Sequence, residues 1–140
     1  MTLIASLREA PANLSVASKF TSACGLLYLV FGALFLLWPA AVQKLFLDPD
    51  FVGNEATLTR LLGMTVAVVG WLYFFGGRSG GKQVVAASIL DRLVLVPLVL
   101  IPAAVAGVFP HTLLLFAALD PALALLAWSL LSRESARPAP

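Results

Sequence analysis

Residues 112–132 read TLLLFAALDPALALLAWSLLS, a continuous apolar run interrupted only by Asp120 and the proline after it. At a rise of about 1.5 Å per residue, a helix of this length covers the roughly 30 Å hydrocarbon layer of a membrane. The part that follows Asp120 is too short to span by itself, so the helix must begin well before the carboxylate. The sequence therefore predicts a membrane-spanning helix that carries an acidic side chain inside the bilayer.

The composition of the whole chain agrees with this prediction. Of its 140 residues, 61% are hydrophobic and only 11% are charged, and the mean hydropathy is +0.99. A water-soluble domain of this size cannot hide so large an apolar fraction. The formal net charge of +2 is too small to indicate a nucleic-acid partner. The composition predicts an integral membrane protein.

Three further apolar runs precede residues 112–132. The sequence predicts an all-α, integral membrane four-helix bundle with spans at about residues 20–42, 56–75, 84–108 and 112–132. Residues 1–19 form an N-terminal tail, for which a short helix on the membrane surface and a disordered segment are both open. Residues 133–140 are polar and contain prolines, which predicts a disordered C-terminal tail.

The lysines and arginines between the apolar runs orient the predicted bundle. Most of them fall in the two tails and the second loop, whereas the loops of the opposite side hold only Lys44. The positive-inside rule then places both termini in the cytoplasm, and the even number of spans agrees. We therefore predict a multi-pass protein of the bacterial inner membrane. The residues on the cytoplasmic side are Arg8, Lys19, Arg78, Lys82, Arg133 and Arg137.

Small residues share a face with Asp120, because residues three, four and seven apart lie on the same side of a helix. The second predicted span has a similar face that begins with Arg60. Small residues let helix backbones approach closely in a membrane, so we expect the two faces to pack together. Arg60 would then either contact Asp120 or extend outward to the lipid headgroups, and Arg92 is the alternative partner of Asp120. The small residues are Ala117 and Ala124 in the fourth span, and Gly63, Ala67 and Gly70 in the second.

The third span contains two adjacent charges, Asp91 and Arg92, whose depth the sequence leaves open. If the helix begins at the start of the apolar run, the pair lies close to the middle of the membrane, where each charge costs on the order of 2.5–3.5 kcal/mol. If the membrane span begins at Leu93, the pair rests at the inner interface.

Prolines inside the third and fourth spans favour a cavity near these charges. Pro97, Pro102 and Pro121 lack a backbone N–H, so they distort their helices and free carbonyl oxygens. Freed carbonyls inside a membrane are tolerated only where protein or water satisfies them. We therefore expect four charged residues either to bound a polar, ligand-binding cavity or to neutralise one another as a structural network. These residues are Arg60, Asp91, Arg92 and Asp120.

The sequence carries no motif of a known catalytic or metal-binding chemistry. It has no Gly-rich phosphate loop, no Ser/His/Asp or Cys/His set and no cluster of metal ligands. It therefore predicts no catalytic residue, no cofactor and no metal site. The single cysteine, Cys24, has no partner for a disulfide and is expected to pack in the core. His111 is expected to cap or hydrate the start of the fourth helix.

Three local patterns resemble a known group of membrane proteins. A glycine-containing first helix ends in Trp38-Pro39, the second helix begins with TRLLG at residues 59–63, and the fourth helix carries an acid. From Gly25 to Trp128 the chain is thus similar to the small uncharacterised four-helix membrane proteins of bacteria, broadly those of the DoxX group. The resemblance implies a four-helix membrane fold with an unknown or accessory role, and it carries over no catalytic residue.

Three functions are open from the sequence. The favoured one is a non-enzymatic membrane protein, either an accessory subunit or a binder of a lipid or another apolar small molecule. The second is a small oligomeric transporter or proton-linked carrier in which Asp120 titrates. The third is a membrane enzyme that uses Asp91 or Asp120 as acid or base on a hydrophobic substrate. The expected partners are the lipid bilayer, a lipid or apolar ligand, and further copies of the chain or a larger membrane complex. No nucleic acid is expected.

Overall fold

The computed structural model describes residues 3–136, and this part of the chain contains helices and no strands. Its elements in chain order are α1 (Leu3–Arg8), α2 (Val16–Leu37), α3 (Pro39–Phe46), α4 (Glu55–Arg78), α5 (Lys82–Leu90), the π-helical segment η1 (Asp91–Leu95), α6 (Val96–Val105) and α7 (Pro110–Ser135). Four stretches are long and apolar enough to cross a membrane, namely α2, α4, α7 and the continuous stretch α5–η1–α6.

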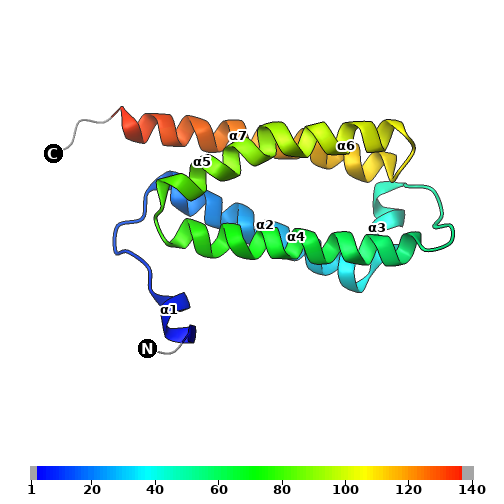
Figure 1. The fold of residues 1–140 in the computed structure, drawn as a ribbon, viewed down its shortest axis with the longest axis horizontal. Coiled ribbons are helices and arrows are strands. Elements are labelled where there is room, and N and C mark those ends of the chain that lie inside the picture. The colour runs from blue at the N-terminus through cyan, green and yellow to red at the C-terminus, as the bar shows by residue number, and fades with distance from the viewer. Residues whose placement is uncertain (1–2, 137–140) are drawn as a thin grey trace.

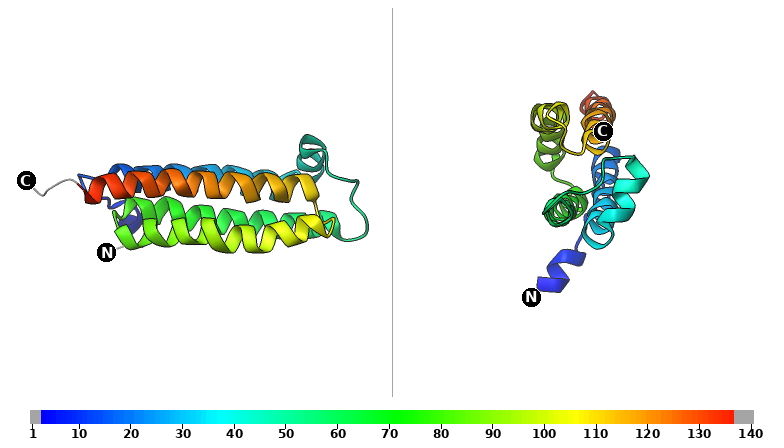
Figure 2. Two further views of the ribbon diagram at one scale, coloured as in Figure 1. Left: turned by 90° about the horizontal axis from the view of Figure 1, so that it is seen from above. Right: turned by 90° about the vertical axis from the view of Figure 1, so that its right-hand side faces the viewer.

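The four long stretches lie side by side, and each runs antiparallel to the one before it (Figure 1 and Figure 2). α2 packs closely on α4, and α6 packs on α7. The two pairs are joined because α2 contacts α7, and because α5 contacts α2, α4 and α7. The described chain begins and ends at the α5 side of this arrangement, and α3 lies at the opposite end (Figure 1).

The first long helix begins and ends earlier than predicted. α2 starts at Val16 and not at residue 20, because Ser15 is its N-cap and accepts a hydrogen bond from the Ser18 N–H at 3.1 Å. It ends at Leu37 and not at residue 42, since Pro39 has no N–H to continue the helix and instead opens the separate helix α3. The predicted N-terminal tail thus supplies α1 and the first turn of α2.

The second and third spans differ from their predicted bounds only at the ends. α4 covers Glu55–Arg78 against the predicted 56–75, and the third stretch covers Lys82–Val105 against the predicted 84–108. The third stretch stops short because the chain turns at Gly107, whose φ of 86° is a left-handed conformation that glycine adopts without strain.

The fourth span is longer than predicted at both ends. α7 starts at Pro110, whose missing N–H is harmless in the first turn of a helix, and it continues to Ser135. Arg133 lies in the last turn, where a positive charge interacts favourably with the helix dipole. The prediction of a disordered tail is therefore wrong for residues 133–135, and residues 137–140 lie outside the described part of the chain.

Glycines bring α2 and α4 into backbone contact. A Cβ atom added to Gly70 would lie 2.6 Å from Leu29 N and 2.7 Å from Gly25 O. A Cβ atom added to Gly63 would lie 2.8 Å from Gly32 O. No side chain fits in these places, so the two helices form the close contact that small residues permit in a membrane.

This contact corrects the predicted packing of the small-residue faces. The face of α4 formed by Gly63, Ala67 and Gly70 packs against α2 and not against α7. The glycines of α2 offer a flatter surface than the alanine-containing face of α7, and flat surfaces allow the closest approach. Ala117 and Ala124 of α7 are buried, and the buried neighbours of Ala124 come from α2, α5 and α7 itself. These neighbours are Ala17, Val85, Ile89 and Ala127.

We expect the substitution Gly70→Val to destabilise the fold. The new Cβ would overlap backbone atoms of α2, so the helices would have to separate, and overpacking costs about 1–3 kcal/mol. Thermal unfolding of the purified protein in detergent, followed by tryptophan fluorescence, measures the loss. Val68→Ile is the control, because Val68 is exposed on the same helix. Equal unfolding temperatures for the two variants would contradict the close contact.

Candidate functional site

A cavity of about 290 Å³ lies between the two helix pairs, and all four long stretches contribute to its lining. Most of the lining is apolar, for example Leu62, Val69, Leu100 and Phe116. Val99 of α6 lines the cavity and is also 62% exposed, so the cavity opens to the outside beside this helix. In the end view of Figure 2 (right), α6 and α4 lie on the left, one above the other, and α7 and α2 lie on the right.

All ionisable residues of the lining gather in one half of the cavity, towards the end where the chain termini lie. The other half, towards α3, is lined by apolar side chains, namely Phe35, Leu62, Leu100, Leu113 and Phe116. The cavity therefore has a polar end and an apolar end, as expected for a site that holds an amphiphilic molecule. The ionisable residues are Tyr28, Tyr73, Asp91, Arg92 and Asp120.

Two tyrosines hold the two carboxylates of the cavity. The hydroxyl of Tyr28 donates a hydrogen bond to Oδ1 of Asp120, and the hydroxyl of Tyr73 donates to Oδ2 of Asp91 at 2.6 Å. The two rings meet edge to face, with their centroids 5.7 Å apart. The contacts of four residues from α2, α4, η1 and α7 thus form one connected polar cluster.

Arg92 lies beside this cluster and is bonded to its own helix. Its side chain is 1% exposed, and its guanidinium donates to the carbonyl oxygen of Ser88 from Nε at 2.9 Å and to the Ser88 hydroxyl from Nη2 at 3.0 Å. The guanidinium carbon lies 5.2 Å from the centre of the Tyr73 ring, which is a cation–π distance. Within residues 3–136, Nη1 has no hydrogen-bond partner, and Arg92 forms no ion pair with Asp91 or Asp120.

The π-helical segment η1 carries both Asp91 and Arg92. The N–H of Val96 bonds to the carbonyl of Asp91, which gives the wide turn of a π-helix, and Pro97 follows directly. A wider turn separates neighbouring side chains by a smaller angle, so two adjacent residues can both line the cavity. The pair follows the helix start at Lys82 by nine and ten residues, inside a continuous apolar stretch. The depth of the pair in a membrane stays a prediction.

Of the four charged residues singled out in the sequence, three lie together and one does not. Asp91, Arg92 and Asp120 all line the cavity. Arg60 is exposed on α4 and does not line the cavity. The predicted contact of Arg60 with Asp120 is therefore wrong, because Tyr28 occupies the hydrogen-bonding position beside that carboxylate.

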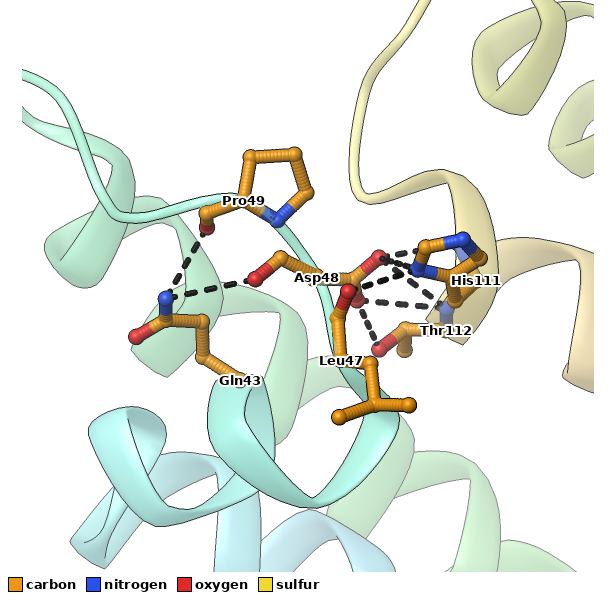
Figure 3. Close-up of polar contacts among 6 residues, drawn as sticks. All are labelled: Gln43, Leu47, Asp48, Pro49, His111 and Thr112. Atoms are coloured by element: carbon orange, nitrogen blue, oxygen red, sulfur yellow. Dashed lines mark hydrogen bonds and ion pairs between the residues drawn. The ribbon is translucent and has the colours of Figure 1, made fainter.

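A second polar cluster closes the end of the protein near α3 (Figure 3). The buried carboxylate of Asp48 accepts hydrogen bonds from the backbone N–H of His111 at 2.8 Å and of Thr112 at 3.2 Å, and from the Thr112 hydroxyl. Gln43 donates to the Asp48 carbonyl at 3.3 Å. The predicted capping role of His111 is thus taken by Asp48, while the His111 ring contacts the Leu47 carbonyl at 2.8 Å. This cluster fixes the start of α7 to the loop after α3.

The sequence pattern did not single out the tyrosines, Asp48 or Gln43 as site residues. Tyr28 and Tyr73 are the two tyrosines of the chain, and both stand inside apolar runs. A phenol inside a membrane needs a hydrogen-bond partner, so their position was a usable signal for a polar cluster. Asp48 carried no such signal, because acids and prolines are common in any loop.

No known family model matches the chain, and comparison with curated proteins and with solved structures returns no match. Among residues 3–136, no group of three or more His, Cys, Asp or Glu side chains is placed to hold a metal ion. The cavity is therefore the feature from which a function has to be argued.

We expect Tyr28→Phe and Asp120→Asn to be non-additive in a double-mutant cycle. Loss of the hydroxyl leaves a buried carboxylate oxygen without its partner, which costs about 1–3 kcal/mol. Unfolding free energies of the two single variants and the double variant give the interaction energy. The matched cycle replaces Tyr28→Phe with Arg60→Gln, and its effects should add within about 0.3–0.5 kcal/mol. Additive effects in the first cycle would contradict the hydrogen bond.

We expect Asp48→Ala to lower the unfolding temperature by several degrees. The substitution leaves the buried N–H and hydroxyl of Thr112 without an acceptor, and loss of a helix cap alone costs about 0.5–2 kcal/mol. Asp50→Ala in the same loop is the control, since Asp50 is exposed and accepts one hydrogen bond, from Gln43. The same shift in both variants would argue against the cap.

Proposed function

We propose that this protein is a non-enzymatic four-helix membrane bundle that binds an apolar small molecule, or one chain of a lipid, in the cavity between its helix pairs. The observation that carries the proposal is the cavity itself, with its apolar lining and its polar cluster at one end. Its volume of about 290 Å³ is close to the lower limit of known small-molecule sites, which begin at about 300 Å³.

The length of the cavity suits a short hydrophobic ligand. Asp120 at the polar end and Leu113 at the apolar end are seven residues apart on α7, which corresponds to roughly 10 Å along a helix. Tyr73 and Leu62 are eleven residues apart on α4, or roughly 16 Å. A molecule of this length would place an apolar body towards α3 and a polar group beside the tyrosines and aspartates.

The position of the opening suggests that the ligand comes from the membrane. Leu95 and Val99 line the cavity and are 58% and 62% exposed, on a stretch long and apolar enough to span. In a bilayer this surface would face lipid. The Asp48 cluster and α3 cover the end of the protein beyond the apolar half of the cavity. A route into the cavity from the membrane, beside Leu95 and Val99, would therefore be shorter than a route from the water at the α3 end.

The proposal includes a location and an orientation. Both ends of the described chain lie on one side, as an even number of spans requires (Figure 1). Lysines and arginines are concentrated on this side, so the positive-inside rule supports cytoplasmic termini in a bacterial inner membrane. A binder without catalysis would also suit the accessory role that the resemblance to the DoxX group implies.

We expect gently solubilised wild-type protein to retain a ligand in native mass spectrometry and Val69→Phe to lose most of it. Val69 lines the cavity, so a phenyl ring there fills part of the volume that the ligand needs. Val68→Phe is the matched control, because Val68 is the neighbouring residue, is 53% exposed and lies outside the lining. Equal ligand occupancy in both variants would show that the retained molecule binds elsewhere, and a bare wild-type protein would count against the binding role.

A further inference from the structure

We propose that the ligand of this cavity is a hydrophobic cation, such as a substituted ammonium with an apolar body. The inference rests on the proposed binding function and specifies the class of ligand. It follows from the balance of charge in the cavity, from the hydrogen bonds that orient its carboxylates, and from the two aromatic rings beside them.

The charged groups of the lining do not balance. Two carboxylates, those of Asp91 and Asp120, share the cavity with a single guanidinium, that of Arg92, and no other Asp, Glu, Lys or Arg lines it. With both carboxylates ionised, one negative charge is left over. A net charge inside a membrane is expensive, because neither lipid nor the protein interior solvates it as water does. A positively charged ligand supplies the missing counter-charge at the place where the charge is in excess.

Arg92 does not neutralise either carboxylate directly. Its Nε and Nη2 atoms are bonded to Ser88, and it forms no ion pair with Asp91 or Asp120 in the described part of the chain. Its Nη1 atom is buried and has no hydrogen-bond partner within residues 3–136. An anionic group of a ligand would thus meet two carboxylates beside a guanidinium that is only 1% exposed.

The two carboxylates differ from Arg92, because each of them has an oxygen that is free to bind a ligand. Tyr28 bonds to Oδ1 of Asp120 and Tyr73 bonds to Oδ2 of Asp91, so each carboxylate is held by one oxygen. The second oxygen of each accepts no hydrogen bond within residues 3–136, and neither belongs to the sealed polar atoms. Both oxygens belong to residues that line the cavity, and both attract a cation.

The tyrosine rings add a second attraction for the same class of ligand. The rings of Tyr28 and Tyr73 both line the cavity beside the carboxylates. The face of an aromatic ring attracts a cation through its quadrupole, and sites built from several rings bind quaternary ammonium groups. Arg92 occupies such a position over Tyr73, so the environment already stabilises one desolvated cation. The Tyr28 ring has no such partner among the described cation–π contacts.

Two probes of the same shape test the inference. Benzyltrimethylammonium is a cation, and neopentylbenzene is its neutral carbon isostere. Full-length protein in nanodiscs of neutral lipid is equilibrated with each probe, and empty nanodiscs correct for partition into lipid. We expect the cation to bind at least about tenfold more tightly than the isostere to the protein. A third probe, the anion 3-phenylpropanoate, should bind more weakly than both.

Substitutions then assign the preference to the cavity. Asp120→Asn removes the excess negative charge, so the ratio of cation to isostere affinity should fall towards one. Glu9→Gln is the control, because it removes one negative charge from an exposed site outside the lining and should leave both affinities unchanged. If Asp120→Asn fails to fold, Asp91→Asn provides the same change of charge on a different helix.

The outcomes separate this inference from the proposed function. Equal binding of cation and isostere, displaced by Val69→Phe, would overturn the charge inference and leave an apolar binding site in place. Tighter binding of the anion would also overturn it and would assign recognition to Arg92. Binding of neither probe to the protein would overturn both proposals. A cation preference that persists in both asparagine variants would place the cation outside the cavity and overturn the inference.

Discussion

The α2 and α4 backbones approach each other closely at their glycines, and the cavity depends on this contact. Because α4 presents its smallest residues to α2, its cavity side consists of larger side chains such as Leu62, Val69 and Tyr73. α6 packs directly on α7, whereas α4 and α6 face each other across these larger side chains. The α2–α4 and α6–α7 contacts are therefore tight, whereas the contact between α4 and α6 is loose. The cavity opens between α4 and α6.

The charges of the cavity are accommodated by hydrogen bonds and not by ion pairs. Each charge near the centre of a span costs on the order of 2.5–3.5 kcal/mol on insertion, and a hydrogen bond to a charged group returns about 1.5–3 kcal/mol. Ser88 provides two such bonds to Arg92, and the tyrosines provide one to each carboxylate. Within the described residues, Nη1 of Arg92 and one oxygen of each carboxylate remain without a hydrogen bond.

Hydropathy predicted four spans because apolar length is a property of the chain alone, whereas the partner of each helix face is not. Gly63 and Gly70 have the same seven-residue spacing as Gly25 and Gly32, but alanines accompany Asp120 as well, and only the shapes in space decide between them. Asp91, Arg92 and Asp120 could be singled out from the sequence because a charged side chain inside a membrane costs free energy. Their tyrosine partners depend on helix rotations, and on a π-helical segment, that no residue spacing specified.

Carboxylates fix both ends of the helix arrangement and so restrict where it can open. Asp48 caps the start of α7, and Oε1 of Glu134 accepts a hydrogen bond from the Ala17 N–H at 2.8 Å in the first turn of α2. Each contact joins segments distant in sequence. The third stretch has no comparable cap at its start, and η1 and Pro102 interrupt its regular hydrogen bonding. This interrupted stretch carries Asp91 and Arg92 and borders the opening of the cavity.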